Sequence, residues 1–151
     1  MPYAELHCLS NYSFLRGASH PSELVERAAA CGYSALAITD ECSLAGVVKA
    51  HVAAKAVGLQ LIIGSEFILS EGIRLIALAP NRTAYGELAG LISRSRRRAP
   101  KGEYVTHLRD ILFHLKRCLL IWLPNDSDHE KVYGQQLARF CKERVWVGIT
   151  R

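Results

Sequence analysis

Short apolar runs alternate with longer segments in which apolar residues recur every three or four positions. The runs at residues 3–8, 35–39 and 60–68 have the length and composition of strands. Between them, residues 19–32 and 43–58 have the spacing of amphipathic helices. Strands joined through helices in this way run parallel. The first half of the chain therefore predicts an α/β fold with a mostly parallel sheet.

The second half of the chain begins with a different connection. Only residues 69–72, with Gly72 among them, separate the third run from a fourth at residues 73–78. So short a gap containing glycine predicts an antiparallel hairpin. Two later apolar runs, at residues 118–123 and 145–149, predict two more strands.

Three further helices are expected in this half. One opens at Asn81 or Thr83, and a short one covers residues 108–115. The last follows Ser127, which begins an S-x-x-E capping box. The apolar face of this last helix would carry Tyr133, Leu137, Phe140 and Cys141.

Residues able to bind metal stand at the ends of three predicted strands. They are His7, the pair Asp40 and Glu41, and Glu66. The carboxyl ends of parallel strands meet at one face, so these side chains are expected to converge. Histidine and carboxylate together are the ligands of hydrolytic centres that use Zn²⁺, Mn²⁺ or Mg²⁺. A divalent metal is therefore the cofactor to consider.

Each of these residues also has a structural interpretation. His7 could be a hydrogen-bonded histidine of the fold. Asp40 and Glu41 could favour the positive end of a following helix. Glu66 lies in an apolar strand, where a buried carboxylate must be paired, and Arg16 or Arg74 could pair with it. The residues alone leave both interpretations open.

Four segments resemble a known family. Residues 3–18, 37–46 and 63–67 resemble the first three motifs of PHP (polymerase and histidinol phosphatase) domains. In detail they are most similar to the N-terminal PHP domain of bacterial C-family replicative polymerases, the polymerase III alpha type. Residues 96–104 resemble the error-prone branch of that family. The resemblance implies a partial, distorted (β/α) barrel with one antiparallel hairpin.

Position by position, the chain departs from the metal-binding pattern of that family. Of the His-x-His pair only His7 is present, because Leu9 takes the second place. Arg16 replaces an aspartate, Glu41 replaces a histidine, and Glu66 is retained. A guanidinium repels a nearby divalent cation. We therefore expect a degenerate site in which Arg16 forms a structural ion pair with Glu41 or Glu66.

Length and composition indicate the domain organisation and the cellular location of the protein. The chain has 151 residues, enough for one domain, and we expect residues 1–151 to be a single PHP-like domain. Because the chain stops shortly after a predicted strand, we expect an N-terminal fragment of a larger polymerase. Its five cysteines form no C-x-x-C pair, which indicates a reduced, cytoplasmic protein. No apolar stretch is long enough to cross a bilayer, so no membrane partner is expected.

A basic stretch follows the first helix of the second half. Five cations lie within eight residues, and the formal net charge is +5. They could be a solvated loop after a helix C-terminus, or they could contact DNA phosphates independently of sequence. The cations are Arg94, Arg96, Arg97, Arg98 and Lys101.

Three functions follow from these patterns. The first is a non-catalytic scaffold in an error-prone polymerase, needing no cofactor of its own. Its expected partners are the polymerase core, DNA, and replication or repair proteins. The second is a surviving metal-dependent phosphoesterase or 3′–5′ exonuclease that uses His7, Glu41 and Glu66. The third is a DNA-binding module that acts through residues 94–101.

Overall fold

The computed structural model describes residues 3–125 and 128–149. The chain divides between Ser65 and Glu66 into two compact units. No helix in the described residues is long and apolar enough to span a membrane. The elements in chain order are β1 (Ala4–Cys8), α1 (Pro21–Ala30), β2 (Ala35–Ile38), α2 (Val47–Val57), β3 (Gln60–Ile68), β4 (Arg74–Ala79), α3 (Arg82–Arg97), α4 (Leu108–His114), β5 (Leu119–Leu123), α5 (Asp128–Phe140) and β6 (Val145–Val147).

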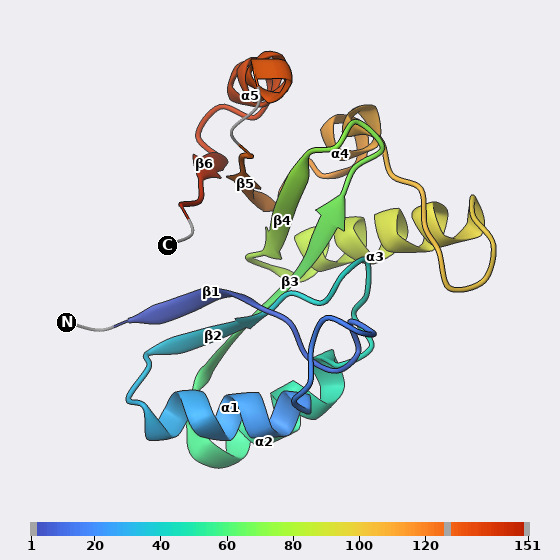
Figure 1. Ribbon diagram of the computed structural model, residues 1–151. Helices are drawn as coiled ribbons and strands as arrows, with labels where there is room; N and C mark the ends of the chain where they lie inside the picture. The colour runs from blue at the N-terminus through green and yellow to red at the C-terminus, as the bar shows by residue number, and fades with distance from the viewer. Residues whose placement is uncertain (1–2, 126–127, 150–151) are drawn as a thin grey trace. The chain divides into compact units, whose positions relative to one another are not determined.

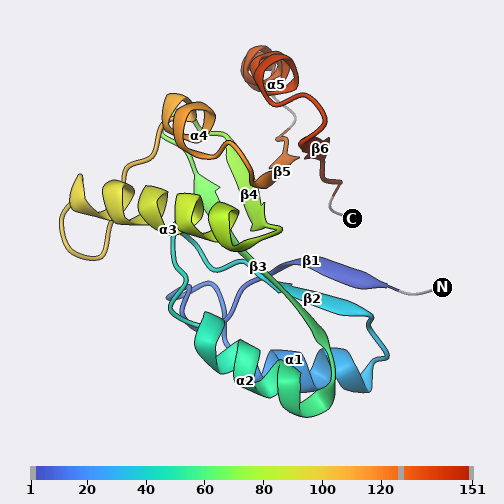
Figure 2. The same ribbon diagram turned by 180° about the vertical axis from the view of Figure 1, so that it is seen from behind.

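The first unit is a parallel sheet covered by two helices. β1 pairs with β2, and β2 pairs with β3 in a register that places Ile38 opposite Ile63. α1 and α2 pack against each other on one side of β1 and β2 (Figures 1 and 2). Their shared core consists of Val25, Ala28, Leu36, Ile38, Ala50 and Ala54.

Local signals fix the ends of these two helices. Pro21 takes the first position of α1, where its missing N–H costs nothing. The Glu23 carboxylate accepts a hydrogen bond of 2.7 Å from the His20 backbone N–H. α2 begins at Val47 rather than near Ser43, and it ends at Val57, where the C-cap Gly58 has a φ of 72°. The helix predicted from residue 43 therefore starts later, and Ser43, which could have capped it, lies outside α2.

The second unit combines antiparallel and parallel pairing. The turn after β3 is closed by a 2.8 Å hydrogen bond from the Leu69 N–H to the Ile73 carbonyl, and β4 is the next neighbour of β3. β4 pairs antiparallel with β5, and β5 pairs parallel with β6. The predicted class, α/β with mostly parallel strands and an antiparallel pair, is confirmed.

α3 and α4 lie together in the second unit. The Asn81 side chain caps α3 by accepting a 3.0 Å hydrogen bond from the Ala84 N–H, as one of the two predicted starts requires. α3 continues to Arg97, so the basic stretch that was expected to follow the helix begins inside it, with Arg94, Arg96 and Arg97 in the last turn. The residues buried between α3, α4 and the strands include Leu88, Leu91, Ile111 and Leu115.

The predicted apolar face of the last helix is confirmed only in part. Leu137 and Cys141 are buried, but Phe140 is 62% exposed, so its predicted place in the core is wrong. Glu130 accepts hydrogen bonds from the backbone and side chain of Asn125, at 2.8 and 3.1 Å. Ser127, the predicted N-cap, lies outside the described residues.

Candidate functional site

The ends of β1 and β2 are joined by paired hydrogen bonds. The Thr39 N–H donates to the Cys8 carbonyl at 2.8 Å, and the Cys8 N–H donates to the Thr39 hydroxyl at 3.0 Å. Burial, with the nearby charges of Glu5 and Asp40, raises the pKa of the Cys8 thiol to about 11. The Cys8 thiol is therefore protonated at neutral pH in the metal-free protein.

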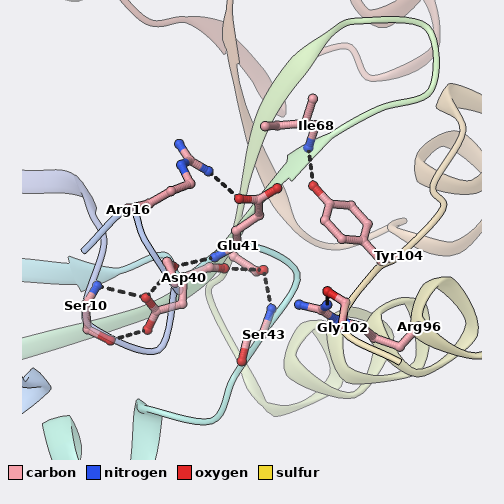
Figure 3. A network of polar contacts seen from close by, with 11 residues as sticks. Ser10, Arg16, Asp40, Glu41, Ser43, Ile68, Arg96, Gly102 and Tyr104 are labelled. Carbon is pink, nitrogen blue, oxygen red and sulfur yellow. Dashed lines mark hydrogen bonds and ion pairs between the residues drawn. The ribbon is translucent and has the colours of Figure 1, made fainter. Parts of the chain in front are cut away.

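Asp40 is buried just beyond β2, and its carboxylate is enclosed by serines of the loop after β1. The Ser10 backbone N–H donates to Oδ1 at 2.8 Å, and the Ser10 hydroxyl donates to Oδ2 at 2.7 Å (Figure 3). The Ser13 hydroxyl also donates to Oδ1, at 2.7 Å. These three hydrogen bonds compensate for the burial of the charge. Asp40 thus holds the loop after β1 against the end of β2.

The backbone around Asp40 is fixed by further hydroxyl groups. The Asp40 carbonyl accepts a 2.7 Å hydrogen bond from the Ser65 hydroxyl, and that hydroxyl accepts one of 3.2 Å from the Ser43 N–H. The Ser13 hydroxyl accepts one of 2.9 Å from the Glu41 N–H. The segment from Asp40 to Ser43 is therefore anchored on both sides within the first unit.

Glu41 is paired with a cation from the loop after β1. Arg16 Nη1 lies 2.6 Å from Glu41 Oε2, and the two side chains are 31% and 21% exposed (Figure 3). Glu41 was one of the two carboxylates that the sequence offered to Arg16. This pair places a positive charge beside a candidate metal ligand.

The other two candidate metal ligands lie in strands. His7 is half-buried in β1, next to the partly buried Leu9, and its backbone N–H donates to Glu5 Oε1 at 2.9 Å. Glu66 is fully buried in β3 and is the first residue of the second unit. Across residues 3–125 and 128–149, no group of three His, Cys, Asp or Glu side chains is arranged to hold a metal ion.

Sequence reasoning missed the polar residues that organise this loop. Ser10 and Ser13 are fully or nearly fully buried despite their position in a polar loop. Gly17 is equally specific, because a Cβ at this position would collide with the Ser10 carbonyl. The usable signal was the group of polar residues Ser10, Asn11 and Ser13 shortly after the end of β1.

The basic stretch divides into two groups in the structure. Arg96 and Arg98 hold the segment after α3 in place. Arg96 donates to the carbonyls of Gly102 and Glu103, at 3.2 and 3.4 Å, and lies over the Tyr104 ring (Figure 3). The Tyr104 hydroxyl in turn accepts a 2.9 Å hydrogen bond from the Ile68 N–H.

Arg98 has a well-defined carboxylate partner. Its guanidinium lies 2.5 Å from Asp110 Oδ2, which also accepts a 2.9 Å hydrogen bond from the His107 N–H. Burial would raise the pKa of Asp110, but the hydrogen bonds from Arg98 and His107 outweigh it and lower that pKa. Arg98 therefore ties the end of α3 to α4.

The remaining cations of the stretch point to solvent. Arg94 and Arg97 lie in the last turns of α3, and Lys101 lies in the turn after it. All three side chains are exposed. Cations in the last turn also suit the negative end of the helix dipole.

The chain matches known proteins along most of its length. The family model for the PHP domain matches residues 5–135. The chain is 58% identical over 151 residues to an error-prone DNA polymerase of Saccharophagus degradans, and 53% identical over 149 residues to one of Teredinibacter turnerae. Each alignment covers 99% of this chain. The chain spans only 15% and 14% of the length of these two relatives.

Two solved structures share the fold at low sequence identity. A candidate metal-dependent phosphoesterase from Bifidobacterium adolescentis aligns with a TM-score of 0.71 and 14% identity, over 97% of this chain and 76% of that one. An amidohydrolase from Chromobacterium violaceum, solved with sulfate and no metal, aligns with a TM-score of 0.64 and 18% identity, over 95% and 75%. The family match, the polymerase relatives and the shared fold agree, and the chain belongs to the PHP domain family.

Proposed function

We propose that this chain is the PHP region of an error-prone DNA polymerase and serves there as a non-catalytic scaffold. The support is the 48–58% identity to proteins of that name along nearly the whole chain. DNA synthesis would belong to the remainder of the larger protein. The partners of the scaffold would be the polymerase core, DNA, and replication or repair proteins. The single-domain organisation expected from the sequence is part of this proposal.

The proposal of a non-catalytic role rests on the contacts that the Asp40 and Glu41 carboxylates make within the fold. The Asp40 carboxylate accepts three hydrogen bonds, all from Ser10 and Ser13. Glu41 accepts a hydrogen bond from the guanidinium of Arg16. A metal ion at this edge would have to displace serine donors and would meet the positive charge of Arg16.

The donors that remain do not fit the metal chemistry of a hydrolase. Such chemistry needs a cation that polarises a phosphoryl oxygen and lowers the pKa of a bound water. Leu9, at the place of the second histidine, offers no lone pair, and within residues 3–125 and 128–149 no three His, Cys, Asp or Glu side chains are grouped to hold a metal ion. We therefore assign these residues to holding the ends of β1 and β2 together and not to hydrolysis.

A hydrolysis assay tests this proposal. The purified chain is incubated with Mn²⁺, Zn²⁺ or Mg²⁺ and offered an activated phosphodiester or a 3′-labelled single-stranded DNA. We expect no release above the rate of a Glu66→Ala variant prepared in parallel. Metal-dependent release by the wild type that Glu66→Ala abolishes would instead establish the phosphoesterase or exonuclease alternative.

A second function, binding of DNA, is favoured by the distribution of charge. Nine of the 19 Lys and Arg residues lie between residues 82 and 117, against three of the 14 Asp and Glu residues. Within this segment Arg94, Arg97 and Lys101 are exposed at one end of α3. Such a cluster can neutralise phosphates and release counterions.

Salt dependence and charge removal test the DNA-binding function. A triple variant with Arg94→Gln, Arg97→Gln and Lys101→Gln should bind DNA more weakly and with a shallower dependence on salt. The matched control removes three exposed charges elsewhere, with Arg27→Gln, Lys55→Gln and Lys142→Gln. Equal losses in both triple variants would show a general charge effect and no specific interface.

A further inference from the structure

α4 carries an exposed aromatic side chain between two cations. Phe113 is 72% exposed, although it lies one residue from the end of a helix in which Leu108 and Ile111 are buried. Arg109 precedes it by four residues and Lys116 follows it by three. The four-residue spacing places Arg109 and Phe113 on one face of α4, and Lys116 lies in the segment just after the helix. Lys116 Nζ lies 5.9 Å from the centre of the Phe113 ring.

We propose that this surface, Arg109, Phe113 and Lys116, binds single-stranded nucleic acid, with one base stacked on the Phe113 ring. The proposal deepens the DNA-binding function and rests on it. It adds a stacking contact to an interface for which the sequence offered phosphate contacts alone. We call these three residues the α4 face.

The fold does not need the Phe113 ring for packing. α4 is held to the second unit by Leu108, Ile111 and Leu115, which are 4%, 0% and 0% exposed. The neighbouring His114 ring meets Phe113 edge-on at 5.0 Å between centroids, which leaves broad area of the ring in solvent. A large aromatic group between cations is costly to leave exposed and is typical of single-strand binding surfaces.

Ion pairs at both ends hold the α4 face in place. Arg98 pairs with Asp110 near the start of α4, and Arg117 lies 2.7 Å from Glu87 just beyond its end. Burial would raise the pKa of Glu87, but hydrogen bonds from the backbone and guanidinium of Arg117 outweigh it and lower that pKa. The first pair joins the end of α3 to the start of α4, and the second joins the first half of α3 to the region just beyond α4. α4 therefore lies antiparallel to α3. The face is thus presented by a fixed helix.

Charge favours nucleic acid as the occupant. The segment from residue 82 to residue 117 carries nine cations and three acids, and two of those acids, Glu87 and Asp110, are already paired with arginine. An acidic peptide would satisfy the cations but gain little from a planar ring. A single strand offers phosphates for Arg109 and Lys116 and a π face for Phe113.

Fluorescence anisotropy with labelled oligothymidine about 20 nucleotides long tests the stacking contact. Phe113→Leu keeps an apolar side chain but removes the ring, and we expect affinity to fall roughly tenfold. Phe113→Tyr keeps the ring and should bind like the wild type. Phe140→Leu is the matched control, because Phe140 is also exposed, at 62%, with Arg139 over its ring at 5.7 Å. This control should not change affinity.

The salt dependence separates stacking from charge. Phe113→Leu should leave the slope of log affinity against log salt unchanged, whereas Arg109→Gln should reduce it by about 0.7. Thermal melting should be unchanged in Phe113→Leu, because the side chain is exposed.

Three results would overturn the inference. The first is that Phe113→Leu binds with wild-type affinity while the triple variant at Arg94, Arg97 and Lys101 binds weakly. The chain would then bind DNA without using the α4 face. Another is the absence of any affinity for single strands, which would remove both. The third is displacement of the oligonucleotide by polyglutamate with equal loss in Phe113→Leu and Phe140→Leu, which would indicate an acidic protein partner.

Discussion

Arg16 and Glu41 form an ion pair of 2.6 Å between two loops that are 25 residues apart in the sequence. Each partner adjoins a residue in the left-handed region, Leu15 with a φ of 61° and Cys42 with a φ of 44°. Non-glycine residues enter this region at a cost and stay there only when their surroundings hold them. The hydrogen bonds from Ser10 and Ser13 to Asp40 fix the two loops against each other, and the ion pair lies within these fixed loops.

The Asp40 cluster should contribute much more to stability than the Arg16–Glu41 pair. Asp40→Ala leaves the donors of Ser10 and Ser13 without their acceptor and should lower the free energy of unfolding by about 2–4 kcal/mol. Asp40→Asn should cost less, because one oxygen remains for the Ser10 N–H. Arg16→Gln should cost below about 1 kcal/mol, because the pair is partly exposed. Urea denaturation measures all three, with exposed Glu26→Ala as control, and an equal cost for Arg16→Gln and Asp40→Ala would contradict the ranking.

Two glycine substitutions should change stability in opposite directions. Gly17→Ala sets a methyl group against the Ser10 carbonyl, so the loop must shift, at a cost of about 1–3 kcal/mol. Gly90→Ala lies inside α3, where an added Cβ meets nothing within 4 Å, and it should stabilise by about 0.5–1 kcal/mol. Melting temperatures that fall for Gly17→Ala and rise for Gly90→Ala are expected. A neutral Gly17→Ala would show that the loop is not held as described.

The Arg98–Asp110 pair should stabilise the protein in a pH-dependent way. The pKa of Asp110 is lowered in the folded protein, so its stabilisation is present above the unfolded pKa of about 4 and is lost as pH falls through the folded pKa. Arg98→Gln should lower the free energy of unfolding at pH 7, and the loss should be modest because Arg98 is 39% exposed and its charge is screened by solvent. Denaturation at a series of pH values should show the difference shrinking below about pH 4. A difference that grows toward acid pH would refute this assignment.

Much of the fold could be predicted because its signals are local. The run at residues 60–68 and the spacing of Leu108, Ile111 and Leu115 each identify their element without reference to the rest of the chain. Other signals depend on distant packing. Ser43 looks like a helix cap, but its hydroxyl accepts a 3.1 Å hydrogen bond from the Ala45 N–H and α2 starts later. Phe140 has the spacing of a core residue, yet nothing covers it enough to bury it.

The site was harder to predict than the fold because its key contacts join separate loops. The residue type of Arg16 indicated an ion pair, but the sequence left its partner open between Glu41 and Glu66. The burial of Asp40 by Ser10 and Ser13 depends on the path of the loop after β1, which no spacing rule describes. The sequence shows the charge of the basic stretch. It does not show that Arg96 and Arg98 bind other parts of the chain, whereas Arg94 and Arg97 are exposed.

Metal content is the most direct test of the scaffold proposal. The purified chain is incubated with excess Mn²⁺ or Zn²⁺, desalted, and analysed by inductively coupled plasma mass spectrometry beside Glu66→Ala. We expect far less than one metal ion per chain in both proteins, because Asp40 is held by serines and Glu41 by Arg16. One or more ions per wild-type chain, lost in a folded Glu66→Ala variant, would contradict it.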